Sequence, residues 1–176
     1  MLGFRAMRLY STKVTAIAGE VVRSLVAAGD IESEAPREVE ADVEAVLSNY
    51  LAQEREVNDR TKELLERTGR AQTEYNRLRE QVAAQKGIKI GEDTLDFLLD
   101  QVVEIFHHSS HVDEIYPEDV VLRRKMAPIF KKHMALEDSI EAEVRAQLKH
   151  VQEGTRTWDI EYARAMDMIK RKKGLS

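Results

Sequence analysis

The sequence carries one helical pattern twice. Under a shift of 81 residues, the apolar positions of segment 14–39 coincide with those of segment 95–120. The clearest matches are Val21 and Val102, Val22 and Val103, Leu25 and Phe106, Pro36 and Pro117, and Val39 and Val120. Beyond Val39 the match continues at a shift of 83, from Val43 and Met126 onward. A duplicated helix–proline–helix unit points to an architecture in which two similar pairs of helices pack together.

Apolar side chains at three- and four-residue spacing predict that both units are helical. We expect short helices near 14–25 and 95–106 and long helices near 36–69 and 117–154. Proline suits the first turn of each long helix, where a missing backbone amide hydrogen breaks no bond. The predicted fold class is therefore all-α, a helical bundle built from two duplicated helix–Pro–helix units.

The segments outside the two units predict two more helices. The charged segment 70–86 has a thin apolar stripe and predicts a more exposed connecting helix. A C-terminal helix is expected at about 156–173, with Thr155 or Thr157 as its N-cap. Pro128 lies inside the second long helix, where it predicts a kink or a break because proline removes one backbone hydrogen bond.

The chain is expected to form a single all-helical domain over residues 7–176. The predicted parts are unit one at about 9–69, unit two at about 90–152 and the C-terminal helix at about 156–173. Residues 8–10 and 89–91 take equivalent places before the two short helices. We predict that these two segments pair as a tiny two-stranded ribbon.

Composition narrows the class of protein. The chain is 34% charged and has no cysteine, which excludes disulfides, thiolate zinc sites and thiol catalysis and fits a reducing cytoplasm. No stretch approaches the length of an apolar membrane span. Residues 1–116 hold 14 Lys and Arg against 22 Asp and Glu, whereas residues 117–176 hold 13 against 10. Such a balance falls short of the basic excess that nucleic-acid-binding domains usually carry.

Three separated phrases carry a resemblance to a known family. They are MRLYSTKVTAIAGEVV, HSSHVDEIYPEDVVLRRKMAPIFKKHM and QEGTRTWDIEYARAMDMIKRKKG. In this order they resemble a bacterial family of unknown function, domain-of-unknown-function family 507, over residues 7–175. The resemblance implies a small, soluble, all-helical bacterial protein. It carries over no catalytic, cofactor-binding or metal-binding residue.

Histidines are the candidate metal ligands. His107 and His111 are four residues apart near a helix end, so both imidazoles could face one metal ion, with Asp113 or Glu114 as oxygen ligands. The competing interpretation is that histidines near a helix C-terminus favour the helix dipole. The equivalent positions of the first unit carry no histidine. His133 falls on an apolar stripe, which is typical of a hydrogen-bonded core residue.

Basic and aromatic residues of the final third are the candidate interaction sites. The basic candidates are Arg123, Arg124, Lys131, Lys132, Lys170, Arg171, Lys172 and Lys173. Such a group could contact the phosphates of a nucleic acid or membrane surface, or could simply stay hydrated and stabilise helix ends. Trp158 and Tyr162 share one face of the last helix. That face either docks on its own bundle or anchors a partner.

We expect a non-enzymatic cytoplasmic scaffold or adaptor that works through protein–protein contacts. No cofactor is expected, because Gly87 and Gly91 lack the lysine and the preceding strand of a phosphate-binding loop. A homodimer is one arrangement that long charged helices allow. The alternatives are a nucleic-acid-associated protein that uses its basic final third and, less favoured, a metal-dependent enzyme around His107 and His111.

Overall fold

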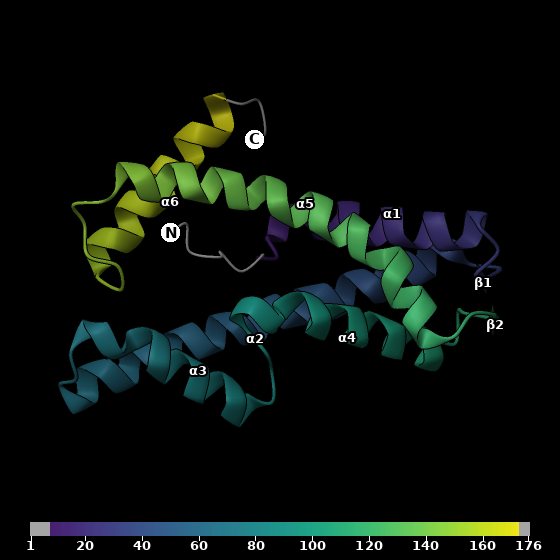
Figure 1. Ribbon diagram of the computed structural model, residues 1–176, viewed down its shortest axis with the longest axis horizontal. Coiled ribbons are helices and arrows are strands. Elements are labelled where there is room, and N and C mark those ends of the chain that lie inside the picture. The colour runs from purple at the N-terminus through teal and green to yellow at the C-terminus, as the bar shows by residue number, and fades with distance from the viewer. Residues whose placement is uncertain (1–7, 173–176) are drawn as a thin grey trace.

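The computed structural model describes residues 8–172, and within them every side chain except those of residues 136–139. This part of the chain is almost entirely helical, as the apolar spacing predicts (Figure 1). Its α-helices are α1 (Val14–Ala27), α2 (Pro36–Thr68), α3 (Tyr75–Lys86), α4 (Thr94–His108), α5 (Asp119–Gln147) and α6 (Arg156–Lys172). Short 3-10 turns precede three of them, namely η1 (Ser11–Lys13), η2 (Gln72–Glu74) and η3 (Gly91–Asp93). The strands are β1 (Ile31–Glu32) and β2 (Glu114–Ile115).

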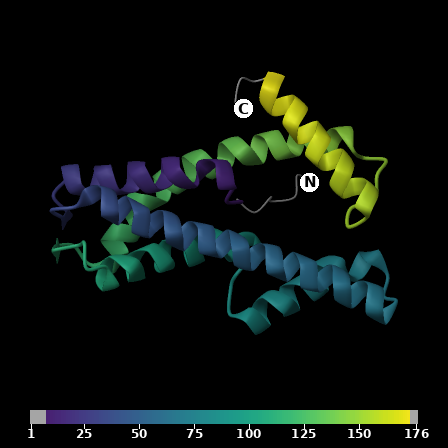
Figure 2. The same cartoon turned by 180° about the vertical axis from the view of Figure 1, so that it is seen from behind.

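Helix α2 runs along the length of the molecule and organises the packing (Figure 2). Helix α1 packs against one end of α2, and α3 packs against the other end. Helix α4 packs against both α2 and α5, and α6 packs on α5. All-α architecture with a connecting helix and a C-terminal helix is thus confirmed.

Among the described side chains, most of the buried apolar residues fall into two clusters. The first cluster joins α1, α2, α4 and the first part of α5. Its largest fully buried side chains are Ile17, Leu25, Ile31, Leu47, Leu98, Phe106, Leu122, Met126, Phe130 and Met134. The second cluster is confined to the last part of α5 and α6, and consists of Ile140, Val144, Leu148, Trp158, Ala165 and Ile169. Helix α5 therefore takes part in both cores.

The predicted ribbon exists, but other residues form it. Strands β1 and β2 pair antiparallel, with Ile31 opposite Ile115. The prediction that residues 8–10 pair with residues 89–91 is wrong. Both segments instead lead into 3-10 turns, and the Lys89 carbonyl accepts a hydrogen bond of 2.8 Å from the Tyr50 hydroxyl.

The long helices match at a shift of 83 from their first residue. Pro36 begins α2, whereas α5 begins at Asp119 and Pro117 lies outside it, so the predicted match of the two prolines is wrong. Val39 is completely buried, but Val120 is 54% exposed, and Leu122 takes the buried position. Three residues join α1 to β1, whereas five join α4 to β2. The two extra residues of the second loop account for the change of the shift from 81 to 83. The duplication itself stays a prediction.

Helix ends follow local signals only in part. Gly69 ends α2 in the left-handed conformation, at φ 65°, where a side chain would be strained. Helix α5 continues through Pro128 without a break, although its first part, near β2, runs at an angle to the rest (Figure 1). It ends at Gln147 rather than at Gly154. The Thr155 hydroxyl accepts a hydrogen bond from the Trp158 amide at 3.1 Å, and so caps α6.

Within the described part of the chain, no helix combines the length and the apolar character that a membrane span requires.

We predict that Leu122→Ala lowers the free energy of unfolding by about 2 to 5 kcal/mol, because it opens a cavity in the first cluster. The matched control, Val120→Ala on the exposed side of the same helix, changes it by less than about 0.5 kcal/mol. Urea unfolding of both variants measures the difference. Equal effects would contradict the register given above.

Candidate functional site

The basic side chains at the start of α5 face acidic side chains of the same molecule. Arg123 Nη1 lies 2.7 Å from Asp100 Oδ1 on α4. Lys125 Nζ lies 2.8 Å from both carboxylate oxygens of Asp30. Asp30 is buried and directly precedes β1. The ammonium group of Lys132 pairs with Glu20 on α1. Three cations near the predicted phosphate-binding surface are therefore paired within the molecule, where they hold α5 against α4, α1 and the loop after α1.

The remaining basic candidates lie apart from one another. Arg124 and Lys131 are exposed on the outer side of α5, two helical turns apart. On α6, Arg171 Nη2 lies 3.1 Å from Asp167 Oδ2, and Lys172 is exposed. Lys170, also on α6, is half-buried. Lys173 lies outside the described residues.

The two candidate metal ligands contact different carboxylates. His107 Nε2 lies 2.7 Å from Asp119 Oδ1 at the start of α5. His111 Nδ1 lies 3.1 Å from Asp42 Oδ2 on α2, a carboxylate that also accepts a hydrogen bond from a neighbouring serine. Across residues 8–172, excluding the undescribed side chains, no three His, Asp or Glu side chains form a metal-binding group. His133 is half-buried and contacts Glu20 Oε2 at 3.1 Å, as its place on the stripe predicts.

Trp158 belongs to the second cluster rather than to an exposed face. It is 9% exposed, and the Arg145 guanidinium lies over its ring, 5.4 Å from the centroid. The Tyr162 ring is 5.8 Å away. Tyr162 is half-buried, and its hydroxyl oxygen is buried without a hydrogen-bond partner. Docking of this face on its own bundle is the interpretation that the contacts support.

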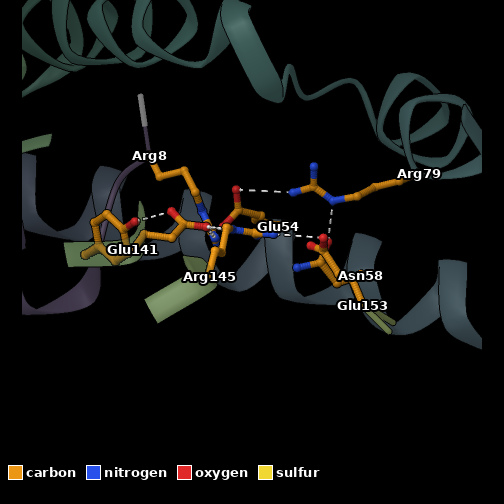
Figure 3. A network of polar contacts seen from close by, with 8 residues as sticks. Arg8, Glu54, Asn58, Arg79, Glu141, Arg145 and Glu153 are labelled. Atoms are coloured by element: carbon orange, nitrogen blue, oxygen red, sulfur yellow. Dashed lines mark hydrogen bonds and ion pairs between the residues drawn. The ribbon is translucent and has the colours of Figure 1, made fainter. Parts of the chain in front are cut away.

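Polar and charged side chains from distant parts of the chain form a network of contacts (Figure 3). Its members come from the N-terminal segment, α2, α3, α5 and the loop before α6. We call it the junction network, and its members are Arg8, Tyr10, Glu54, Asn58, Arg79, Glu141, Arg145 and Glu153. None of these residues stood among the sequence candidates.

Glu141 is the centre of the junction network. It is 3% exposed, although it is an acid. Arg8 Nη1 donates to its Oε1 at 2.6 Å, and the Tyr10 hydroxyl donates to its Oε2. Arg145, one turn later on α5, donates to Oε1 at 3.0 Å. Arginine contacts of this kind are the strong, charge-assisted class of hydrogen bond, and they satisfy a carboxylate that burial would otherwise destabilise.

The other half of the network lies on α2 and α3. Arg79 Nε donates to Asn58 Oδ1 at 2.6 Å, and its Nη2 lies 3.6 Å from Glu54 Oε2. Only 13% of the Glu54 side chain is exposed. On the opposite side, Arg145 Nη1 donates to Glu153 at 2.8 Å in the loop after α5. Three arginines thus meet three glutamates, so the network presents no net charge to a ligand.

The pKa values of the two buried glutamates, Glu141 and Glu54, are shifted in opposite directions. Burial alone would raise the pKa of Glu141, but the charge of Arg8 and the hydrogen bond from Tyr10 hold it below its usual value. For Glu54, burial outweighs the attraction of Arg8 and Arg79, so its pKa is raised. Burial and the contact with Glu141 also raise the pKa of Tyr10. Glu54 is therefore the member of this pair that more readily takes up a proton.

A sequence signal for this network did exist. Glu141 lies seven residues after buried Met134 and seven before buried Leu148, so it occupies a core position of α5. Glu54 lies four residues after buried Tyr50 in the same way. A carboxylate on an apolar stripe requires a buried partner. For Glu141, the i,i+4 spacing indicates Arg145 as one partner, but Arg8, which is 133 residues away, could not be found from the sequence.

The comparisons with known proteins agree with the predicted resemblance. A family model described as "Protein of unknown function (DUF507)" matches residues 7–175. No curated protein matches the chain.

We predict opposite effects for two matched substitutions in the junction network. Glu141→Gln lowers the free energy of unfolding at pH 7 by about 2 to 4 kcal/mol, because it leaves Arg8 and Arg145 without a carboxylate. Glu54→Gln raises the free energy of unfolding at pH 7, because the folded state disfavours the ionised form.

Urea unfolding at several pH values separates the two cases. The folded-state pKa of Glu141 is lowered, so its contribution is complete above the ordinary value of 4.5 and disappears as the pH falls through the lowered pKa. The folded-state pKa of Glu54 is raised, so the advantage of Glu54→Gln shrinks as the pH falls through that raised pKa towards 4.5. Effects of the same sign for both variants at pH 7 would contradict this assignment.

Proposed function

We propose that this chain, which belongs to the DUF507 family of proteins of unknown function, is a non-enzymatic helical scaffold or adaptor that binds other proteins. The observation that carries the proposal is the internal pairing of its charged groups. Arg123, Lys125 and Lys132 pair with acids of the same molecule, and the junction network balances its own charges. Side chains used in this way hold a frame together rather than bind phosphate or activate a substrate.

Exposed apolar side chains supply the contact points of the proposed scaffold. Tyr116 and Val120 are 61% and 54% exposed where β2 leads into α5. Ile160 and Met168 are 50% and 64% exposed on α6. These two groups lie at opposite ends of the molecule, since β2 and α6 are far apart in Figure 1. A long helical frame with an apolar contact at each end suits a protein that connects partners.

The proposal includes a cytoplasmic location and two related units. Absence of cysteine fits a reducing compartment. The order short helix, strand, long helix occurs twice, as α1–β1–α2 and α4–β2–α5. A duplicated frame would place similar surfaces at two sites, and a homodimer is the special case in which the partner is a second copy.

We predict that a protein partner is recovered through one of the two apolar contacts. The tagged chain is purified from its bacterial host beside Tyr116→Ser/Val120→Ser and Ile160→Ser/Met168→Ser, and quantitative mass spectrometry compares the three samples. One of the double variants loses a partner roughly tenfold, because apolar contacts at the centre of an interface carry most of its energy. The other variant retains it and serves as the matched control.

Nuclease treatment and solution mass complete that experiment. Equal thermal midpoints show that the variants are folded. Loss of the partner after nuclease would favour the nucleic-acid alternative, for which the exposed Arg124, Lys131 and Lys172 are the available cations. Light scattering tests the homodimer directly. Recovery that is unaffected by both double variants would contradict the proposed contacts.

A further inference from the structure

The end of α5 and helix α6 form a unit with a core of its own. The buried apolar side chains of residues 140–169 pack on one another, whereas those of the first cluster end at Met134. We call residues 140–172 the arm and residues 8–134 the body. Among the described side chains, the two apolar clusters are separate, so the hydrophobic effect holds each of them together without joining them.

Polar contacts hold the arm against the body. Arg8 and Tyr10 of the body donate to Glu141 of the arm, as described above. Farther along, Lys62 Nζ on α2 lies 2.9 Å from Asp159 Oδ2 on α6. Water can replace the contact between Lys62 and Asp159 at moderate cost, because their side chains are 36% and 50% exposed. The contact between Arg8 and Glu141 is the stronger of the two, since the Glu141 side chain is only 4% exposed.

The boundary between arm and body, which we call the seam, also leaves two buried polar atoms without hydrogen bonds. They are Tyr162 Oη in the arm and Gln72 Oε1 in the body. Gln72 Oε1 faces the arm, since a Cβ built on Gly154 would lie only 2.7 Å from it. Burial raises the pKa of Tyr162, as does Glu141 of the same arm, whereas the charge of Arg8 across the seam lowers it. Each of these atoms would regain a hydrogen bond in water, so the closed seam carries a cost that opening removes.

From these contacts we infer that the arm is a movable element that swings away from the body along this seam by bending of α5, the helix that connects the two, and that Arg8 and Lys62 hold it closed. The ion pairs favour the closed arrangement, and the two unsatisfied atoms favour the open one. Opposing terms of this kind allow both arrangements to be populated. The inference goes beyond the proposed function, because it concerns movement within one molecule and requires no partner.

Pulsed electron spin resonance can measure this movement. Because the chain has no cysteine, two introduced cysteines are its only thiols for spin labels. Labels at Glu66 on α2 and Met168 on α6, both exposed, report the distance between body and arm. Labels at Glu66 and Glu92 report a distance within the body. Each pair is measured with Arg8→Gln, with Lys62→Gln and with the control Arg123→Gln, which removes an ion pair inside the body.

We expect Arg8→Gln and Lys62→Gln each to raise the ratio of long to short arm–body distances roughly twofold to tenfold, the range for losing one hydrogen bond or ion pair of a partly exposed side chain. Arg123→Gln leaves that ratio unchanged, and the body distance stays the same in all variants. If neither Arg8→Gln nor Lys62→Gln changes the arm–body distances, the arm is fixed and the inference is wrong. A change of the body distance would also overturn it, because the contacts would then support the whole fold.

Discussion

The carboxylate of Glu141 joins two parts of the molecule whose apolar clusters are separate among the described side chains. It is buried on α5, and it takes hydrogen bonds from Arg8 and Tyr10 of the N-terminal segment and from Arg145 of its own helix. A buried carboxylate without such partners would cost several kcal/mol, of the order of an unpaired buried ion. The N-terminal segment is therefore held in two ways, by Leu9 in the first cluster and by the contacts of Arg8 and Tyr10 with this carboxylate.

Helix α5 explains why such a contact is needed. Its first part completes the core with α1, α2 and α4, and its last part forms a second core with α6. Apolar packing fixes each part locally, and helix α5 and the contacts of the seam join the two parts. Buried ion pairs often contribute little net stability, and in some proteins they act by favouring one geometry. The junction network is consistent with that role, since its charges balance and its partners come from five different segments.

Much of the fold could be predicted from periodicity and local signals. The apolar stripes of α1, α2, α4 and α5 are the buried faces, and Gly69 ends α2. The register of the second unit could not be predicted from Pro117, because proline also fits just outside a helix start. The basic residues of α5 looked like a phosphate-binding surface, yet Asp30, Glu20 and Asp100 neutralise three of its cations. Pairings of that kind depend on which helices become neighbours.

By itself, the sequence determined the helices, their order and their buried faces, since these follow from the spacing of apolar residues along one segment. It also placed Glu54 and Glu141 at core positions of α2 and α5. Only the tertiary structure decided which distant arginines would meet them, where the two strands would pair, and that Trp158 would lie inside a second core. The reason is that a charge can be neutralised by any opposite charge that the fold brings near, and sequence spacing carries no record of that choice.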